Sequence, residues 1–160
     1  MAESGALRLW SGAVLDEWID YNGHMSEGFY GVVFGMASDE YLTRMGFDEH
    51  YRATARGSFY TVETHIAFID ELAPGAALVV DTTVAGADPK RVHLFHELRR
   101  AGNDALAATQ ESLMLHVDTR IDRVAPMGEE LYAVLRADAE AHTGRLAAGT
   151  TGRAIRAAGA

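Results

Sequence analysis

The segment from Glu27 to Met45 constrains the fold most, because it is long enough for a helix and apolar on nearly all sides. Ser26 suits the start of this helix, since a serine oxygen can accept from the free backbone N–H groups of the first turn. Gly46 suits its end, as the usual residue of a left-handed C-terminal cap. The apolar side chains leave no wide polar stripe: Phe29, Tyr30, Val32, Val33, Phe34, Met36, Ala37, Tyr41, Leu42 and Met45. A helix that is apolar all round is a buried one, so other elements are predicted to wrap around it.

Three glycines lie on one face of this helix. Gly28, Gly31 and Gly35 are spaced by three and four residues, and each lowers helix propensity by roughly 1 kcal/mol relative to alanine. The missing side chains leave a slot that begins one turn beyond His24. Two interpretations are open: close packing against a sheet or a partner subunit, and a channel for a slender arm of a substrate.

The rest of the chain predicts strands that supply the wrapping. Long segments rich in β-branched and aromatic residues are joined by short turns, which favours antiparallel neighbours. A polar connector precedes these strands, and an amphipathic helix follows them. The expected elements are a short strand at 7–14, a helical turn within 47–56, strands at 58–70, 77–85, 91–100 and 105–118, turns at 71–75, 86–89 and 101–104, and a helix at 127–142.

This order of elements predicts an α+β protein with the hotdog fold, in which a curved antiparallel β-sheet wraps around a long central helix. We expect a single domain over residues 1–142 and a loose or disordered tail over residues 143–160, which are dominated by Ala, Gly, Thr and Arg. Wrapping leaves the sheet edges unpaired, and pairing with a second copy removes that liability. The expected assembly is a homodimer with a continuous sheet, or a homotetramer made of two such dimers.

Composition argues against several classes of function. The formal net charge of −9 disfavours nucleic acid or an anionic membrane as a partner. No Cys occurs, which excludes disulfides, thiolate metal sites and a cysteine nucleophile. No apolar run approaches a membrane span, and the first residues lack the basic and apolar regions of a signal peptide. We therefore expect a soluble, cytoplasmic protein.

An acid, an amide and an imidazole alternate just before the central helix, at Asp20, Asn22 and His24. Asn22-Gly23 is a strong turn signal because both residues tolerate positive φ. On such a turn the three polar side chains can point the same way, which makes it a candidate active site. Taken alone, an Asp-x-Asn-Gly sequence is more typical of a turn that only leads into a helix.

Several blocks together resemble the hotdog acyl-CoA thioesterases of the 4-hydroxybenzoyl-CoA thioesterase-like superfamily. The blocks are Asp20–Met25, Tyr60–Ile66, Ala87–His96 and Leu115–Asp118. The resemblance covers roughly residues 10 to 126 and is strongest to the betainyl-CoA thioesterases of carnitine metabolism, found alone or fused to carnitine dehydrogenase. The Asp-x-Asn-x-His pattern is also similar to that of plant acyl-carrier-protein thioesterases. Their further Glu aligns with Glu71, for which a surface loop is the other interpretation.

The resemblance implies a hydrolase that releases free acid and CoA from a small acyl-CoA, with betainyl-CoA as the first candidate. Such a reaction needs an activated water or a nucleophile, and donors where the carbonyl oxygen becomes negative. No Gly-x-Ser-x-Gly elbow occurs in the sequence. We assign Asp20 as base or nucleophile, Asn22 as orienting water or the thioester, and His24 as oxyanion donor or proton relay. Backbone N–H groups at the helix start are further donors. CoA is part of the substrate, and no separate cofactor is expected.

Glu63 is a fourth catalytic candidate, and His65 is a candidate for substrate binding. A carboxylate in the middle of a β-branched strand needs partners or a raised pKa if it is buried. By strand parity Glu63 and His65 share a face with Phe59 and Thr61. Glu63 is therefore either catalytic or a partner for a cationic substrate group. The structural alternatives are a carboxylate paired with His65 or an Arg, and a side chain facing solvent.

A betainyl substrate carries a fixed trimethylammonium group, which favours aromatic faces and nearby negative charge. Lys90 and Arg91 follow a turn and are candidates for binding the phosphates of CoA. His93 and His96 are three apart on a strand and point to opposite faces, which argues against a shared metal site. The aromatic candidates, for which core packing is the alternative, are Trp18, Tyr21, Tyr30, Phe34 and Tyr60.

Two other functions stay open from the sequence. A hotdog hydratase or dehydratase would act on an acyl thioester with an Asp/His pair, although its usual motif places Pro-Ile before the His, which is absent here. A non-catalytic acyl-CoA-binding protein would need the same pocket and no base. Steady release of free thiol from an acyl-CoA distinguishes the thioesterase from both.

Overall fold

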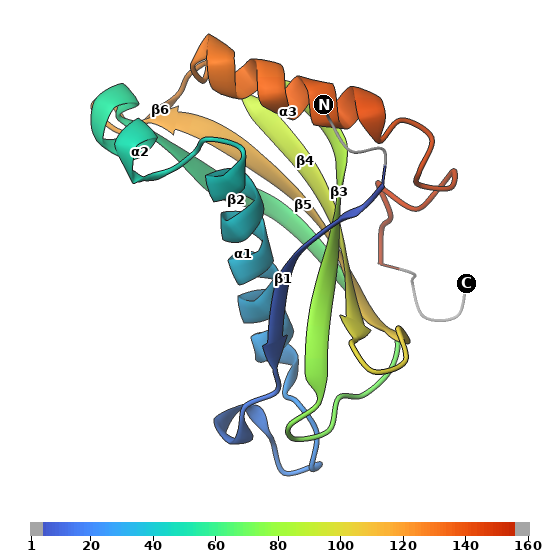
Figure 1. Ribbon diagram of the computed structural model, residues 1–160. Helices are drawn as coiled ribbons and strands as arrows, with labels where there is room; N and C mark the ends of the chain where they lie inside the picture. Colours follow the sequence, from blue (N-terminus) through green and yellow to red (C-terminus); the bar gives the residue numbers. More distant parts are fainter. Residues whose placement is uncertain (1–4, 156–160) are drawn as a thin grey trace.

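The structure, a computed structural model, describes residues 5–155 of the chain. Its sheet has the strand order β1-β3-β4-β5-β2 with antiparallel neighbours, and β6 is added to β5. Figure 1 shows the sheet curving around one side of the long helix α1, with α3 across one end of the strands. This arrangement confirms the predicted α+β hotdog fold. The elements are β1 (Leu7–Ala13), a 3-10 turn (Asp16–Trp18), α1 (Glu27–Arg44), α2 (Glu49–Ala55), β2 (Gly57–Phe68), β3 (Ala77–Asp88), β4 (Arg91–Arg100), β5 (Leu106–Asp118), β6 (Arg123–Val124) and α3 (Glu129–Ala141).

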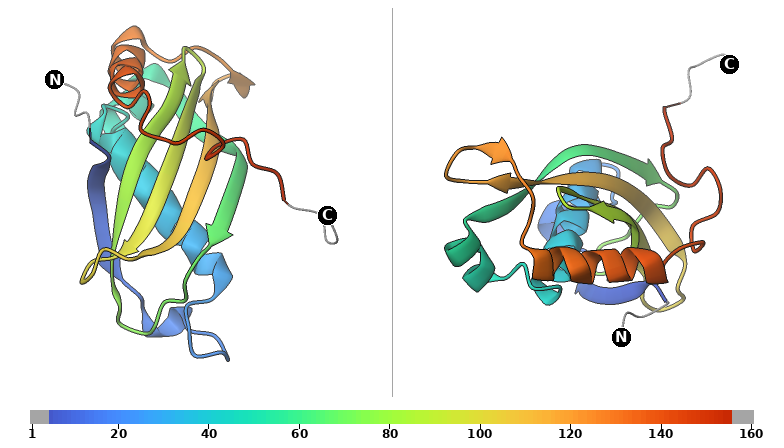
Figure 2. Two further views of the ribbon diagram at one scale, coloured as in Figure 1. Left: turned by 90° about the vertical axis from the view of Figure 1, so that its right-hand side faces the viewer. Right: turned by 90° about the horizontal axis from the view of Figure 1, so that it is seen from above.

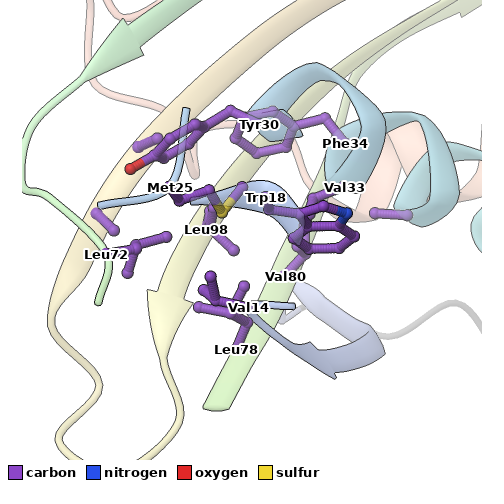
Figure 3. Close-up of a cluster of buried hydrophobic side chains, with 13 residues drawn as sticks. Val14, Trp18, Met25, Tyr30, Val33, Phe34, Leu72, Leu78, Val80 and Leu98 are labelled. Carbon is purple, nitrogen blue, oxygen red and sulfur yellow. The ribbon is translucent and has the colours of Figure 1, made fainter. Parts of the chain in front are cut away.

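The core lies between α1 and the concave face of the sheet. Val33, Phe34 and Tyr41 of α1 are completely buried there. Figure 3 shows the cluster at the N-terminal half of α1, where Trp18 and Met25 from the preceding loop pack with side chains of the sheet. A second cluster joins the C-terminal half of α1 to α3. Burial of this apolar area, at about 25 cal/mol per Å², is what holds the helix on the sheet.

The opposite side of α1 is uncovered. Val32 and Met36 are 42% and 43% exposed, and a Cβ added at Gly28 or Gly35 would meet no atom within 4 Å. The prediction of a helix surrounded on nearly all sides is therefore wrong for a single chain. The reason is that the sheet ends at β2, so it is too narrow to close around the helix.

Two local predictions also differ from the structure. The turn predicted at 86–89 is shorter, because β3 continues to Asp88 by means of a bulge between Val84 and Gly86. A bulge absorbs an extra residue and lets a glycine stay within the strand. Ser26 is the N-cap of α1 as predicted, but its side chain makes no capping hydrogen bond. The first N–H groups of α1 therefore lack a side-chain cap.

Two buried polar contacts fix α3 to the rest of the fold. The Val84 N–H donates to Nδ1 of His142 at 2.9 Å, and the Tyr41 hydroxyl donates to Asp138 at 3.1 Å. The bulge after Val84 lies where the first of these contacts forms.

No helix within residues 5–155 is long and apolar enough to cross a membrane.

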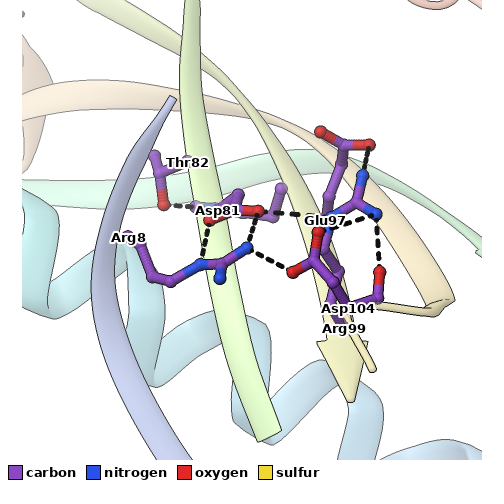
Figure 4. A network of polar contacts seen from close by, with 7 residues as sticks. Arg8, Asp81, Thr82, Glu97, Arg99 and Asp104 are labelled. Atoms are coloured by element: carbon purple, nitrogen blue, oxygen red, sulfur yellow. Dashed lines mark hydrogen bonds and ion pairs between the residues drawn. The ribbon is translucent and has the colours of Figure 1, made fainter. Parts of the chain in front are cut away.

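A network of charged side chains ties β1, β3 and the β4–β5 turn together (Figure 4). Arg8 donates to both oxygens of Asp81 at 2.7 Å and also to Asp104. Arg99 pairs with Glu97 at 2.7 Å and with Asp81 at 3.2 Å. Asp81 is largely buried, and guanidinium groups engage both of its carboxylate oxygens, so we interpret the network as structural.

The chain after α3 crosses the face of the sheet that points away from α1 (Figure 2). It forms no helix or strand up to residue 155. The Gly152 N–H donates to the two carboxylate oxygens of Glu111, at 2.8 and 2.9 Å. Residues 156–160 of the predicted loose tail lie outside the described residues, and the boundary at residue 142 stays a prediction.

Candidate active site

The loop before α1 forms the predicted turn. The Asp20 N–H donates to the His24 carbonyl at 3.0 Å, and the Gly23 N–H donates to the Asp20 carbonyl at 2.9 Å. The Asp20 carboxylate accepts from the Asn22 N–H at 2.8 Å, and Gly23 has a φ of 80°. The turn therefore needs a short acceptor side chain at its first position and a glycine at its fourth.

Two backbone hydrogen bonds hold this turn at the N-terminal end of α1. The Met25 N–H donates to the Leu72 carbonyl, and the Ser26 N–H donates to the Trp18 carbonyl, both at 2.9 Å. Leu72 belongs to the loop that follows β2. The structure thus brings the turn, the start of α1 and this second loop together at one end of the molecule.

His24 and Glu71 meet across these two loops. Nε2 of His24 lies 3.3 Å from Oε1 of Glu71, and both side chains reach the surface. Arg100 holds the second loop in place by donating to the Asp70 carboxylate at 2.6 Å and to the Glu71 carbonyl. For Glu71 the surface-loop interpretation was incomplete, since the residue is exposed but faces the imidazole. The one signal in the sequence was its alignment with the further Glu of plant acyl-carrier-protein thioesterases.

Glu63 and His65 lie on the other face of the sheet. A bulge between Thr61 and Glu63 shifts the register of β2, so the side chains from Glu63 onward point to the opposite faces of the sheet from those expected for an unbroken strand. Phe59 and Thr61 consequently face α1, whereas Glu63 and His65 line a 390 Å³ cavity on the outer face with His93 and Glu111. The predicted shared face is therefore wrong, because the parity argument assumed an unbroken strand. Nothing within residues 5–155 brings Glu63 to the Asp20 turn.

Most of the chain, from the residue after β1 to the middle of α3, matches one known family. Residues 14–135 match the thioesterase-like superfamily. The chain belongs to this superfamily. It is 38% identical over 139 residues to a betainyl-CoA thioesterase of Pseudomonas aeruginosa, an alignment covering 87% of each chain. Over 139 residues it is 41% identical to an L-carnitine dehydrogenase/betainyl-CoA thioesterase of Rhizobium meliloti, covering 87% of this chain and 28% of that one.

A solved structure of a candidate thioesterase from Pseudomonas putida KT2440 is also similar. It is 36% identical to the present chain, with a TM-score of 0.80, and the alignment covers 95% of this chain and 97% of that one. This chain and the Pseudomonas putida protein therefore share the hotdog fold over almost their entire lengths.

The aromatic candidates do not form one cage within this chain. Trp18 is buried and stacks on Phe29 with ring centres 5.5 Å apart, and Phe34 is buried against His96 at 5.9 Å. Tyr30 is buried edge-on to Phe68, where burial raises the pKa of its hydroxyl. Tyr21 is 97% exposed on the turn, and Tyr60 is half exposed on the edge strand β2.

The basic candidates lie at the far end of the strands from the Asp20 turn (Figure 1). Lys90 forms the β3–β4 turn, and Arg91 donates to Asp88 at 2.6 Å. His93 and His96 lie on opposite faces, as predicted. His93 contacts Glu111 on the outer face at 2.8 Å, while His96 is buried between Ser38 and Thr82. No group of three or more His, Asp or Glu side chains among residues 5–155 has an arrangement that fits a metal ion.

The Asp20 turn offers a defined set of chemical groups. The Asp20 carboxylate has one oxygen engaged by the Asn22 N–H, and no described residue hydrogen-bonds to its other oxygen. His24 lies beside the Glu71 carboxylate, with its Nε2 3.3 Å from Oε1. The start of α1 adds backbone N–H groups and the positive end of the helix dipole. Such a set suits a general base, a proton carrier and an oxyanion site.

Proposed function

We propose that the protein hydrolyses a small acyl-CoA thioester, betainyl-CoA first among the candidates, to the free acid and CoA. The observation that carries the proposal is the 38% identity to a betainyl-CoA thioesterase over 87% of both chains. The fused relative, 41% identical over its matching part, has the same activity in its name. CoA enters and leaves as part of the substrate, without a separate cofactor, and we expect the reaction to take place in the cytoplasm.

In the proposed mechanism, the carboxylate of Asp20 either removes a proton from an attacking water or itself attacks the thioester carbonyl. In the second case the acyl group is left on Asp20 as an anhydride, which water then hydrolyses to the free acid and the restored carboxylate. Asn22 orients the water or the thioester. The carbonyl oxygen becomes negative and is stabilised by His24 and by N–H groups at the start of α1. The C–S bond then breaks, and His24, which lies beside Glu71, supplies a proton to the departing sulfur.

The active unit in this proposal is a homodimer joined along β2, with a homotetramer as the larger alternative. Three features support the dimer. β2 is an edge of the sheet, and unpaired edges favour pairing with another chain. Apolar side chains are exposed along this edge and on the uncovered side of α1: Val32, Met36, Tyr60, Val62 and Phe68.

The proposal is tested by thiol release from betainyl-, carnitinyl-, short-chain and aromatic-CoA esters. We expect the wild type to release thiol steadily, most efficiently from betainyl-CoA. Asp20→Asn should lower turnover by at least about 10²-fold, since a positioned base contributes about 10²- to 10⁴-fold. Because the Asn22 N–H can still bond to the new amide oxygen, the turn should keep its geometry, which circular dichroism and the melting temperature check.

Near-normal turnover by Asp20→Asn would remove Asp20 from the catalytic role. Glu63→Gln is the matched control, since it makes the same kind of change on the outer face of the sheet and should leave turnover within about twofold. A wild type that binds betainyl-CoA without releasing thiol would point to the binding protein instead. Absorbance changes of an enoyl thioester would identify the hydratase.

A further inference from the structure

An open groove runs beside α1 on the side that the sheet leaves uncovered. Its volume is 380 Å³, and we call it the glycine groove; it is lined by Gly31, Gly35, Ser38, Asp39, Phe59, Thr61, Thr64, Ile66, Gln110, Ser112 and Met114. A Cβ added at Gly31 would have Ile66 Cδ1 as its nearest atom, at 4.0 Å, and one added at Gly35 would meet nothing within 4 Å. Close packing within the chain therefore does not explain these glycines.

Ser112 brings an unsatisfied polar atom to this groove. It lies on β5 with its side chain toward α1 and is 3% exposed. Its Oγ has no hydrogen-bond partner among the described residues. Buried hydroxyls nearly always have a partner, because leaving one unpaired is costly. The Ser112 oxygen is therefore not engaged within the chain and is available to a molecule bound in the groove.

The lining has the character of a site for a cation. Asp39 contributes a carboxylate at the exposed rim, and the floor carries the oxygens of Gln110 and Ser112. Phe59 contributes an aromatic ring, whose face attracts positive charge. None of the described residues that line the groove is a Lys, Arg or His. An anionic group would therefore find no counter-charge here, whereas a compact cation would.

We propose that the glycine groove receives the quaternary ammonium end of the acyl group, an inference that rests on the proposed thioesterase function. The positive charge of such a group is spread over its methyl groups, which donate no conventional hydrogen bond. Ser112 Oγ and the Phe59 ring contact these methyl groups, and Asp39 balances the charge from the rim. The wide space beside Gly31 and Gly35 accepts a bulky, branched head.

Because the acyl group is short, a groove that holds its cationic head must lie close to the groups that attack its carbonyl. In this proposal those groups belong to the second chain. Only one methylene separates the nitrogen of a betainyl group from its carbonyl. Antiparallel pairing of β2 with its copy would bring the partner's Asp20 turn toward the C-terminal half of this chain's α1, in which Asp39 lies. The carbonyl would thus be attacked from one chain while its cationic head is held by the other.

The test compares betainyl-CoA with 3,3-dimethylbutanoyl-CoA, which replaces the nitrogen by carbon and so keeps the shape without the charge. We expect Asp39→Asn to lower kcat/KM for the cationic ester by about 3- to 30-fold and to leave the neutral ester within about twofold. Ser112→Ala should also lower kcat/KM for the cationic ester. Glu40→Gln is the matched control, because it removes a neighbouring exposed carboxylate that does not line the groove.

The outcomes separate this inference from the proposed function. Equal loss for both esters, or no loss, in Asp39→Asn would overturn the cation site while leaving the thioesterase intact. If the neutral ester is turned over too slowly, its inhibition constant against betainyl-CoA replaces kcat/KM in the comparison. A wild type that releases thiol from neither ester would instead overturn the proposed function, on which the cation site rests.

Mixed dimers test the two-chain arrangement. Gly35→Phe fills the groove, and Asp20→Asn disables the turn. If each site combines one chain's turn with the other chain's groove, mixing the two inactive variants by refolding restores one working site per mixed dimer. No recovery, in mixtures shown by mass spectrometry to contain mixed dimers, would overturn the arrangement.

Discussion

His96 is a buried titratable residue whose role in the fold is structural. Its two ring nitrogens lie 2.9 Å from Ser38 Oγ and 3.0 Å from Thr82 Oγ1, and the ring is completely buried. Ser38 also donates to the Phe34 carbonyl at 3.0 Å, so its hydroxyl accepts from the imidazole. The contacts of the ring are thus satisfied without a ligand.

Burial lowers the pKa of His96 to about 4, and this predicts a pH dependence of stability. In the unfolded chain a histidine titrates near its ordinary pKa of about 6.5. Between these values the unfolded chain binds a proton that the folded chain does not. The free energy of unfolding should therefore fall as the pH drops from about 6.5 to about 4, by at most about 1.4 kcal/mol per pH unit from this residue.

Urea unfolding at several pH values measures this effect, with His96→Gln as the control. The amide side chain cannot titrate but can still bond to Ser38 and Thr82. The difference in unfolding free energy between the two proteins should shrink as the pH falls through this window. A difference that stays constant with pH would show that folding does not lower the pKa of His96.

At the scale of elements, one corner of the fold depends on a glycine. Gly57 begins β2, and a Cβ added there would lie 2.3 Å from Nε2 of His116. That nitrogen accepts from the Tyr51 hydroxyl at 3.1 Å, and the same hydroxyl accepts from the Gly128 N–H at 2.9 Å. This chain of contacts joins α2, β5 and the start of α3.

Gly57→Ala should therefore destabilise the fold by about 1–3 kcal/mol, the usual cost of overpacking a filled site. Gly86→Ala is the control, because Gly86 also lies in a strand and an added Cβ there would meet nothing within 4 Å. Thermal unfolding of both variants measures the difference. Equal melting temperatures for the two variants would mean that Tyr51 and His116 can shift to make room for the added methyl group without loss of stability.

At the scale of the whole molecule, the uncovered side of α1 and the edge strand β2 point to a second copy. A charge placed on this edge should block the proposed dimer, because two copies of it would meet near the symmetry axis and lose their hydration. Val62→Asp is expected to sediment at the chain mass, and the wild type at twice or four times that mass.

Val124→Asp is the matched control for this experiment. Val124 is 45% exposed, like Val62 at 53%, but lies on β6 away from the β2 edge. It should keep the assembly of the wild type. Sedimentation of the wild type as a monomer at the concentrations used for catalysis would contradict the dimer and the two-chain site together.

The sequence alone determined what depends on neighbours along the chain. The α1 boundaries, the β4 boundaries and the turn at Asn22-Gly23 follow from caps, periodicity and the φ tolerance of glycine, all of which act over a few residues. The family resemblance likewise depended on short blocks, and the match over residues 14–135 confirms it.

Only the tertiary structure decided which side chains meet. The bulge at Val62 moved Glu63 away from the face where parity had put it, and His24 found Glu71 through two loops that are far apart in sequence. The groove beside Gly31 and Gly35 exists because the sheet stops at β2 and leaves that side of α1 open. Contacts of this kind depend on strand register and sheet width, which are set by packing of the whole chain rather than by local preference.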